Sequence, residues 1–111
     1  MDISQFLLLL LKGLSELDFV EKVDVDTEVF ILKGRAILKE NRFLQVYFNE
    51  LTGTIAFALI ERGKRIWGID CDNMRGWHLH PRKDPEAHQN IEKKTVDEII
   101  KLLSELWPLL R

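Results

Sequence analysis

The chain has 111 residues, of which 46% are hydrophobic and 31% are charged. This length fits a single domain, residues 1–111, and this composition excludes an intrinsically disordered chain. The net charge of -2 excludes a general attraction to nucleic acid, so any such binding has to be local. The charges belong mostly to Lys, Arg and Glu, with few Asn and Gln, a balance typical of thermophile proteins.

The expected location is the cytoplasm. Cys71 is the only cysteine and cannot form an internal disulfide, so nothing indicates an oxidising compartment. The leucine run at 7–11 is too short to cross a bilayer, and Lys12 and an acidic lead-in distinguish it from a signal peptide. We therefore expect no association with a membrane.

The first expected element is a helix that Asp2 caps. Apolar residues at helical spacing form one stripe along it, and three more leucines, Leu8, Leu9 and Leu11, widen that stripe. A helix that is apolar over so much of its circumference is either buried on several sides or lies in a partner interface.

From Phe19 onward the apolar residues follow a period of two, which predicts strands. Turn residues separate the segments, at Glu40-Asn41, Thr52-Gly53 and Arg62-Gly63. Short connections make neighbouring strands antiparallel, so we expect a meander of four or five strands. The clearest segments are 29–38, 43–48, 54–60 and 65–70.

A second helix is expected at the C-terminal end. Thr95 and Glu98 form a capping box, apolar residues follow at helical spacing, and Pro108 is expected to disrupt the last turn. The predicted fold class is therefore α+β, an antiparallel four- to five-stranded meander sheet with an N-terminal and a C-terminal helix packed on one face. The other face of the sheet is left open for binding.

The candidate functional residues lie in the stretch 65–88, which contains all three histidines and has no steady apolar period. We expect its second half to be a loop. His78 and His80 alternate in an extended segment, so their side chains share a face. Asp84-Pro85 predicts a short helical turn that carries His88, whose imidazole can turn back toward the other two.

Two kinds of chemistry suit these histidines. With Asp70 or Asp72, the three imidazoles have the ligand types of a zinc or other divalent metal site. Alternatively, two imidazoles can remove and return a proton on a phosphodiester while Arg65 or Arg75 holds the phosphate, as in ribonuclease chemistry. The simpler interpretation is that the loop histidines are solvated or hydrogen-bonded to the backbone.

Local basic and aromatic residues indicate nucleic-acid binding. Six Lys and Arg residues lie between 62 and 83, and Trp67, Trp77 and Tyr47 are able to stack on bases. The competing interpretation is a hairpin tip that is basic for solubility, with tryptophans that pack in the core.

The segments Arg-Ile-Trp-Gly-Ile-Asp-Cys-Asp-Asn at 65–73 and Gly-Trp-His-Leu-His-Pro at 76–81, followed by Pro85 and His88, resemble the TumE-type toxin family of prokaryotic toxin-antitoxin systems. The resemblance implies a small toxin that acts on RNA or translation and is neutralised by a cognate antitoxin. The positions that fall on the shared pattern are Arg65, Asp72, Asn73, His78, His80 and His88.

From the residues and the resemblance together, we expect catalysis or metal binding, with zinc as a candidate, at His78, His80 and His88. Substrate binding is expected at Arg65, Asp72, Asn73, Arg75 and Trp77. The alternative is a non-catalytic protein-interaction module with a structural His-rich loop, in which the leucine-rich helix or an exposed edge strand binds a partner or a second copy of the chain as a homodimer.

Overall fold

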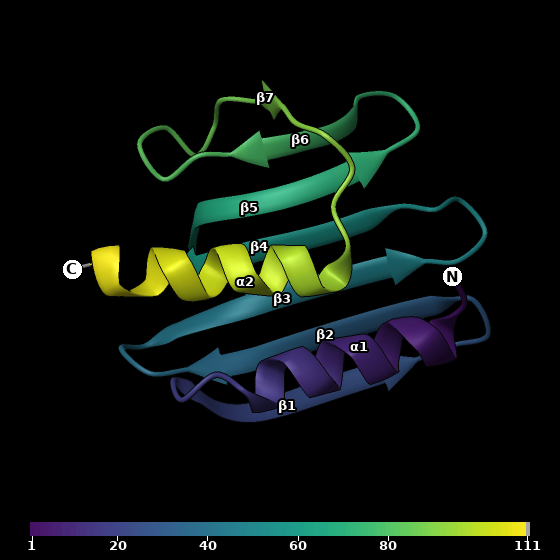
Figure 1. Ribbon diagram of the computed structural model, residues 1–111, viewed down its shortest axis with the longest axis horizontal. Coiled ribbons are helices and arrows are strands. Elements are labelled where there is room, and N and C mark those ends of the chain that lie inside the picture. The colour runs from purple at the N-terminus through teal and green to yellow at the C-terminus, as the bar shows by residue number, and fades with distance from the viewer. Residues whose placement is uncertain (111) are drawn as a thin grey trace.

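The computed structural model describes residues 1–110 and shows two helices on a single antiparallel sheet (Figure 1). The helices are α1 (Ile3–Ser15) and α2 (Val96–Leu106), and a 3-10 turn, η1 (Trp107–Leu109), follows α2. The strands are β1 (Val20–Thr27), β2 (Ile31–Leu38), β3 (Arg42–Asn49), β4 (Ile55–Glu61), β5 (Lys64–Asp72), β6 (Gly76–His80) and β7 (Gln89–Asn90). They lie in the sheet in the order of the sequence.

The α+β class and the meander are confirmed, but the expected number of strands is wrong. The sheet has seven strands rather than four or five. The additional strands β6 and β7 fall in the segment that the sequence predicts to be a loop. In β6 one face carries Trp77 and Leu79, and the other carries His78 and His80 where a strand pattern needs apolar residues. The sequence did not predict β6 because the buried positions of this strand are histidines and not apolar residues.

Both helices cover the same face of the sheet (Figure 1). Phe6 of α1 stacks on Phe48 of β3 with ring centroids 4.5 Å apart, and the buried face of α2 consists of aliphatic side chains. On the strands, alternate residues such as Phe57, Leu59 and Ile69 join this core. Because side chains alternate across a strand, their neighbours point to the opposite face, which no helix of residues 1–110 covers.

The ends of the helices follow from the predicted caps. The carboxylate of Asp2 accepts a hydrogen bond from the amide of Gln5, and Thr95 and Glu98 form a reciprocal capping box. Pro108 lies in η1, where the α-helical hydrogen bonding has already ended, as its missing amide predicts. No helix in residues 1–110 combines the length and the hydropathy that a bilayer crossing requires.

Candidate functional site

The hairpin of β5 and β6 places polar side chains on the sheet face opposite the helices. Asp70 pairs with His78, and Gly68 pairs with His80. The alternate residues Ile69 and Leu79 belong to the core side of the same strands. His78 and His80 are nevertheless only 2% and 1% exposed. Another part of the chain must therefore cover them.

The cover is the segment between β6 and β7, residues 81–88. It folds through two tight turns, closed by hydrogen bonds from the Asp84 amide to the Pro81 carbonyl and from the Ala87 amide to the Asp84 carbonyl. The predicted helical turn is wrong, since these residues form no helix. The carbonyl of Pro85 lies 2.9 Å from Nδ1 of His80, which fixes the segment over the buried ring.

The three imidazoles gather into one cluster, as the sequence predicts. The ring centroids of His80 and His88 are 4.7 Å apart, and each of these rings lies 5.2 Å from that of His78. One ring nitrogen from each histidine lies within 4.8 Å of those of the other two. His88 is the exposed member and the other two are buried, so the cluster opens to solvent on the side of His88.

Asp70 lies against the two buried rings of this cluster. Its Oδ2 is 3.0 Å from Nε2 of His80 and 3.4 Å from Nε2 of His78. The same oxygen is 3.7 Å from Nη1 of Arg65. The other oxygen, Oδ1, is buried and has no hydrogen-bond partner among the described residues. We define the histidine cluster as Asp70, His78, His80 and His88.

A β-bulge brings Arg65 to the histidine cluster. Leu59 pairs with Trp67, but Ile60 pairs with Arg65, so Ile66 is an extra residue in β5. The bulge moves Arg65 from the helix-covered face, where regular alternation with Trp67 would place it, to the face of Asp70. Gly68 leaves room for it, because a Cβ atom there would lie 3.3 Å from Cδ of Arg65.

Arg75 reaches the cluster from the turn between β5 and β6. Its guanidinium contacts Nε2 of His88. Partial desolvation, together with the positive charge of Arg75, lowers the pKa of His88, which favours the neutral imidazole. The cluster therefore has a guanidinium group on each of two sides, from Arg65 and Arg75.

The remaining predicted binding residues lie outside the cluster. The carboxylate of Asp72 accepts hydrogen bonds from the amides of Arg75 and Met74, at 2.7 and 2.9 Å, and so closes the turn in which exposed Asn73 lies. The Arg75 amide is the main reason that the pKa of Asp72 is lowered. Trp77 packs against the core on the opposite face of the sheet.

The structure thus selects Asp70 over Asp72 as the carboxylate beside the histidines. The distinction comes from the register of the hairpin, because Asp70 pairs directly with His78, whereas Asp72, on the same face, pairs with Gly76. Cys71, one residue along, faces the core side, and partial burial raises the pKa of its thiol. Trp67 is 5% exposed and packs in the core, as its simpler interpretation predicts.

Three imidazoles and a carboxylate are a donor set that zinc and other divalent first-row ions take. Imidazole is also the side chain most often used as a general acid or base. Comparison with protein-family models, with curated proteins and with solved structures finds no match to this chain.

Proposed function

We propose that this chain is the toxin of a prokaryotic toxin-antitoxin system and that it cleaves phosphodiester bonds of RNA at the histidine cluster, in the cytoplasm, until a cognate antitoxin neutralises it. One observation carries the proposal: three imidazoles gather in one cluster, with Asp70 against the two buried rings and with Arg65 and Arg75 at its sides. The resemblance of the 65–88 stretch to TumE-type toxins supports the same function.

Phosphodiester cleavage needs two things from a protein. A group must activate the attacking oxygen, and positive charge must stabilise the phosphate as its negative charge redistributes. The histidine cluster provides the first group. The guanidinium groups of Arg65 and Arg75 provide the second, because their paired N–H donors match phosphate oxygens.

The open sheet face beside the cluster suits a single strand of nucleic acid. Strand β4 presents Ala56 between Tyr47 on β3 and Asp70 on β5, with Ala58 and then Ile60 farther along the same face. Neighbouring strands are roughly 4.8 Å apart, so the side chains of β3 and β5 border a shallow path about 10 Å wide. The ring of Tyr47 provides a stacking surface for a base along this path.

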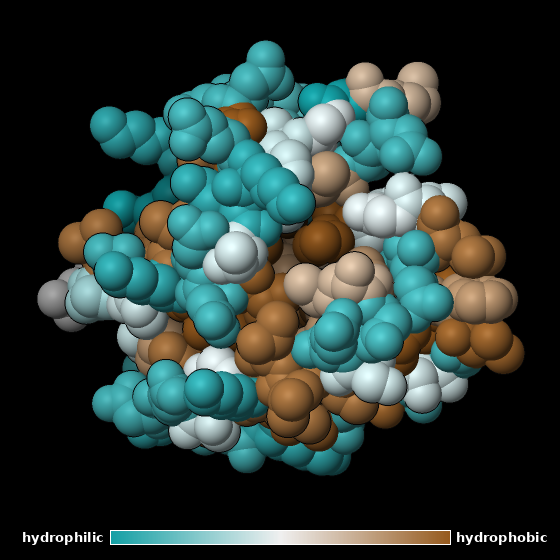
Figure 2. Space-filling view, turned by 45° about the vertical axis from the view of Figure 1, so that its right-hand side comes forward, coloured by the Kyte–Doolittle hydropathy of each residue, from teal (hydrophilic) through white to brown (hydrophobic). Residues whose placement is uncertain are grey.

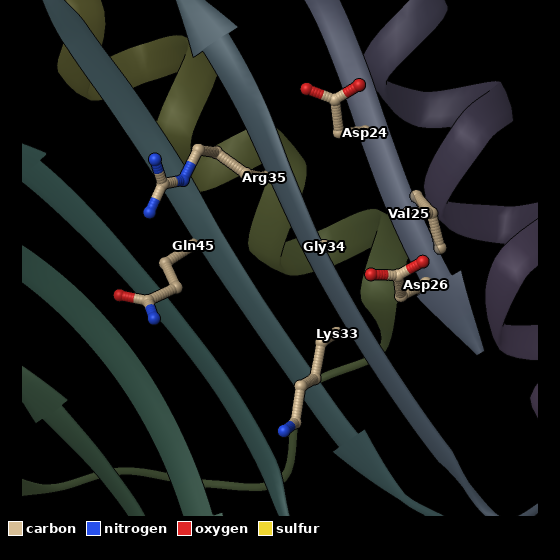
Figure 3. A pocket seen from close by; sticks show the side chains of 7 residues that line it. All are labelled: Asp24, Val25, Asp26, Lys33, Gly34, Arg35 and Gln45. Atoms are coloured by element: carbon tan, nitrogen blue, oxygen red, sulfur yellow. The ribbon is translucent and has the colours of Figure 1, made fainter. Parts of the chain in front are cut away.

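Farther along the same face, Lys33 and Arg35 border a hollow of about 560 Å³ (Figure 3). In this view the helices lie behind the sheet, so the hollow belongs to the open face. Within residues 1–110, neither Lys33 nor Arg35 has an ion-pair partner, and Cζ of Arg35 lies 4.2 Å from the centroid of the Phe43 ring. Neither positive charge is therefore neutralised by a carboxylate there. Asp24 and Asp26 lie opposite them on the edge strand β1. Their negative charges repel phosphate, so the path for RNA ends there.

The test is cleavage of single-stranded RNA of mixed sequence by the purified chain. We expect the wild type to cut it and the double variant His78→Ala/His80→Ala to leave it intact. A matched control is Lys101→Ala, which removes an exposed charge from α2 on the other side of the molecule. Equal cleavage by wild type and double variant, or no cleavage by either, removes the proposal.

A second candidate function, a protein-interaction module, is favoured by exposed apolar residues. Leu8 on α1 is 69% exposed, and Val29 and Leu51 in the turns are 80% and 70% exposed. Figure 2 shows hydrophobic residues together at its right-hand edge. Such surface is typical of a partner interface.

This candidate is tested by Leu8→Lys. The substitution should abolish self-association, measured by light scattering, or binding of an antitoxin, without changing the fold. Lys12→Ala, a change on the same helix, is the control. If Leu8→Lys has the same mass in solution and the same antitoxin binding as wild type, the protein-interaction function is contradicted.

A further inference from the structure

Two backbone contacts determine which ring nitrogens of the buried histidines carry protons. Nδ1 of His80 lies 2.9 Å from the carbonyl oxygen of Pro85, and Nδ1 of His78 lies 3.2 Å from that of Gly76. A carbonyl oxygen only accepts hydrogen bonds, so both Nδ1 atoms must donate. A neutral imidazole has one N–H group, and therefore each ring presents a lone pair on Nε2.

Both Nε2 atoms face the same carboxylate oxygen. Oδ2 of Asp70 is 3.0 Å from one and 3.4 Å from the other, although a carboxylate is also an acceptor. Protons in both gaps would make two imidazolium ions in rings that are 1–2% exposed. Arg65 and Arg75 already contribute positive charge beside them. A single cation between the three acceptors satisfies all of them with neutral rings.

We propose that His78, His80, His88 and Asp70 bind one divalent first-row transition-metal ion, and that zinc fits this set of ligands. Ligating histidines typically donate their other N–H to a carbonyl or carboxylate, which is what the Nδ1 atoms of His78 and His80 do. Neutral imidazoles with one carboxylate are typical zinc ligands.

The separations between Asp70 and the two buried histidines agree with tetrahedral coordination. Ligands at the usual zinc distances of about 2.0–2.1 Å lie roughly 3.3 Å from each other at the corners of a tetrahedron. The observed separations of 3.0 and 3.4 Å between Oδ2 of Asp70 and the two Nε2 atoms bracket that value. His88 is the ligand that has to approach, and it is exposed and follows the last turn of the covering segment.

Two further groups fit the same site. Oδ1 of Asp70 is buried without a partner among the described residues, so it is available to the ion. Arg75 contacts Nε2 of His88. Ligation of the ion through that nitrogen would release the guanidinium of Arg75, which then becomes available to a phosphate.

This inference deepens the proposed function and rests on it only for the role of the ion in cleavage. Since four protein ligands fill a tetrahedral shell, the ion would act in cleavage by taking a phosphoryl oxygen as a fifth ligand and polarising it. Binding of the ion itself depends on the ligands alone and is measurable without RNA.

The experiment is titration of the chelator-treated protein with zinc chloride, followed by calorimetry and by elemental analysis after dialysis. We expect one zinc per chain, and at least a 10- to 100-fold weaker affinity for Asp70→Asn and for His88→Ala. His88→Ala changes an exposed ring and keeps the test valid if variants of buried residues fail to fold. Glu86→Gln is the matched control, because it removes a carboxylate from the same covering segment.

The outcomes separate the two proposals. Zinc affinity that is the same in His88→Ala, Asp70→Asn and wild type overturns the metal site, as does the absence of binding to the wild type. RNA cleavage that persists in excess chelator overturns the role of the ion in cleavage and leaves the ribonuclease proposal standing. Binding of one zinc per chain without any RNA cleavage supports the metal site and overturns the ribonuclease proposal. A cobalt complex with the absorption of a tetrahedral ion would confirm the coordination number.

Discussion

Oδ2 of Asp70 lies 3.0 Å from Nε2 of His80, although the two residues are ten positions apart in the chain. The hairpin of β5 and β6 creates this contact, with Asp70 paired to His78 and its diagonal neighbour His80 within reach. Because the contact joins two strands at one edge of the sheet, any change in their register would separate the carboxylate from the rings.

The first prediction concerns the metal and stability. A ligand that binds only the folded state stabilises it by about 2.7 kcal/mol at a concentration one hundred times its Kd. For a domain of this size, 1 kcal/mol shifts the unfolding midpoint by roughly 4–8 °C. Zinc at that concentration should therefore raise the midpoint by about 10–20 °C, as measured by circular dichroism.

His88→Ala should remove most of this zinc-dependent shift while leaving the midpoint of the zinc-free protein close to that of wild type, since the ring is exposed. Magnesium is the control ion, because it prefers oxygen ligands in an octahedral arrangement. A midpoint that does not depend on zinc concentration contradicts the prediction.

The second prediction concerns Gly68. A Cβ atom at this position would lie 2.8 Å from the carbonyl oxygen of Phe57 and 3.3 Å from Cδ of Arg65. Gly68→Ala should therefore destabilise the fold by about 1–3 kcal/mol, as overpacking does. It should also displace Arg65 and reduce RNA cleavage. Urea unfolding and cleavage assays measure the two effects.

Gly34 provides the matched control, since it is also a strand glycine. A Cβ atom there meets nothing closer than 3.5 Å. Gly34→Ala should leave stability unchanged or raise it by about 0.4–1 kcal/mol, because alanine restricts the unfolded chain. Equal effects of the two substitutions would show that the close approach at Gly68 is not what matters.

The sequence predicted the elements whose buried positions are apolar. The spacing of Val96, Ile99, Ile100 and Leu103 predicts α2, and the alternation around Phe57 predicts β4. These patterns are local, and the core that they form also explains why both helices pack on one face.

The features that the sequence did not predict depend on contacts between strands. β6 buries histidines whose ring nitrogens have polar partners in Asp70 and in the carbonyls of Gly76 and Pro85, so its burial pattern is not apolar. The bulge at Ile66 places the side chain of Arg65 on the other face of the sheet. No local pattern in the sequence indicates which residue of β5 is the extra one. The gathering of His78, His80 and His88 was predicted, whereas the choice of Asp70 over Asp72 required the register.

The third prediction concerns the capping box of α2. The amide of Thr95, together with its hydroxyl, lowers the pKa of Glu98 in the folded state. A carboxyl with a depressed pKa stabilises the fold above its unfolded pKa, and this contribution is lost as pH falls through the folded value. Stability should therefore decrease below about pH 4.3, the ordinary pKa of glutamate.

Glu98→Gln should reduce the slope of stability against pH in that acid range, because glutamine keeps the capping hydrogen bond but does not titrate. The measurement is the urea midpoint at several pH values. Glu105→Gln removes the same charge from the far end of α2 and should leave the slope unchanged. An identical pH dependence of Glu98→Gln and wild type would count against the prediction.

The last prediction concerns the open sheet face as the RNA path. If Lys33 and Arg35 contact phosphates, Lys33→Ala/Arg35→Ala should weaken the binding of single-stranded RNA and leave the cleavage rate at saturating RNA close to that of wild type. The slope of log affinity against log salt should become shallower by about 0.7 for each phosphate contact that is lost. The two substitutions together should therefore remove roughly 1.4 from the slope.

Binding is measured by fluorescence anisotropy of labelled RNA over a range of salt concentrations, with chelator present to prevent cleavage. Lys101→Ala on α2, on the helix-covered side, should leave the slope unchanged. If the slope is the same in the double variant and in wild type, the RNA does not bind along this face of the sheet. Arg65 and Arg75 would then have to hold the phosphate next to the histidine cluster without help from β2.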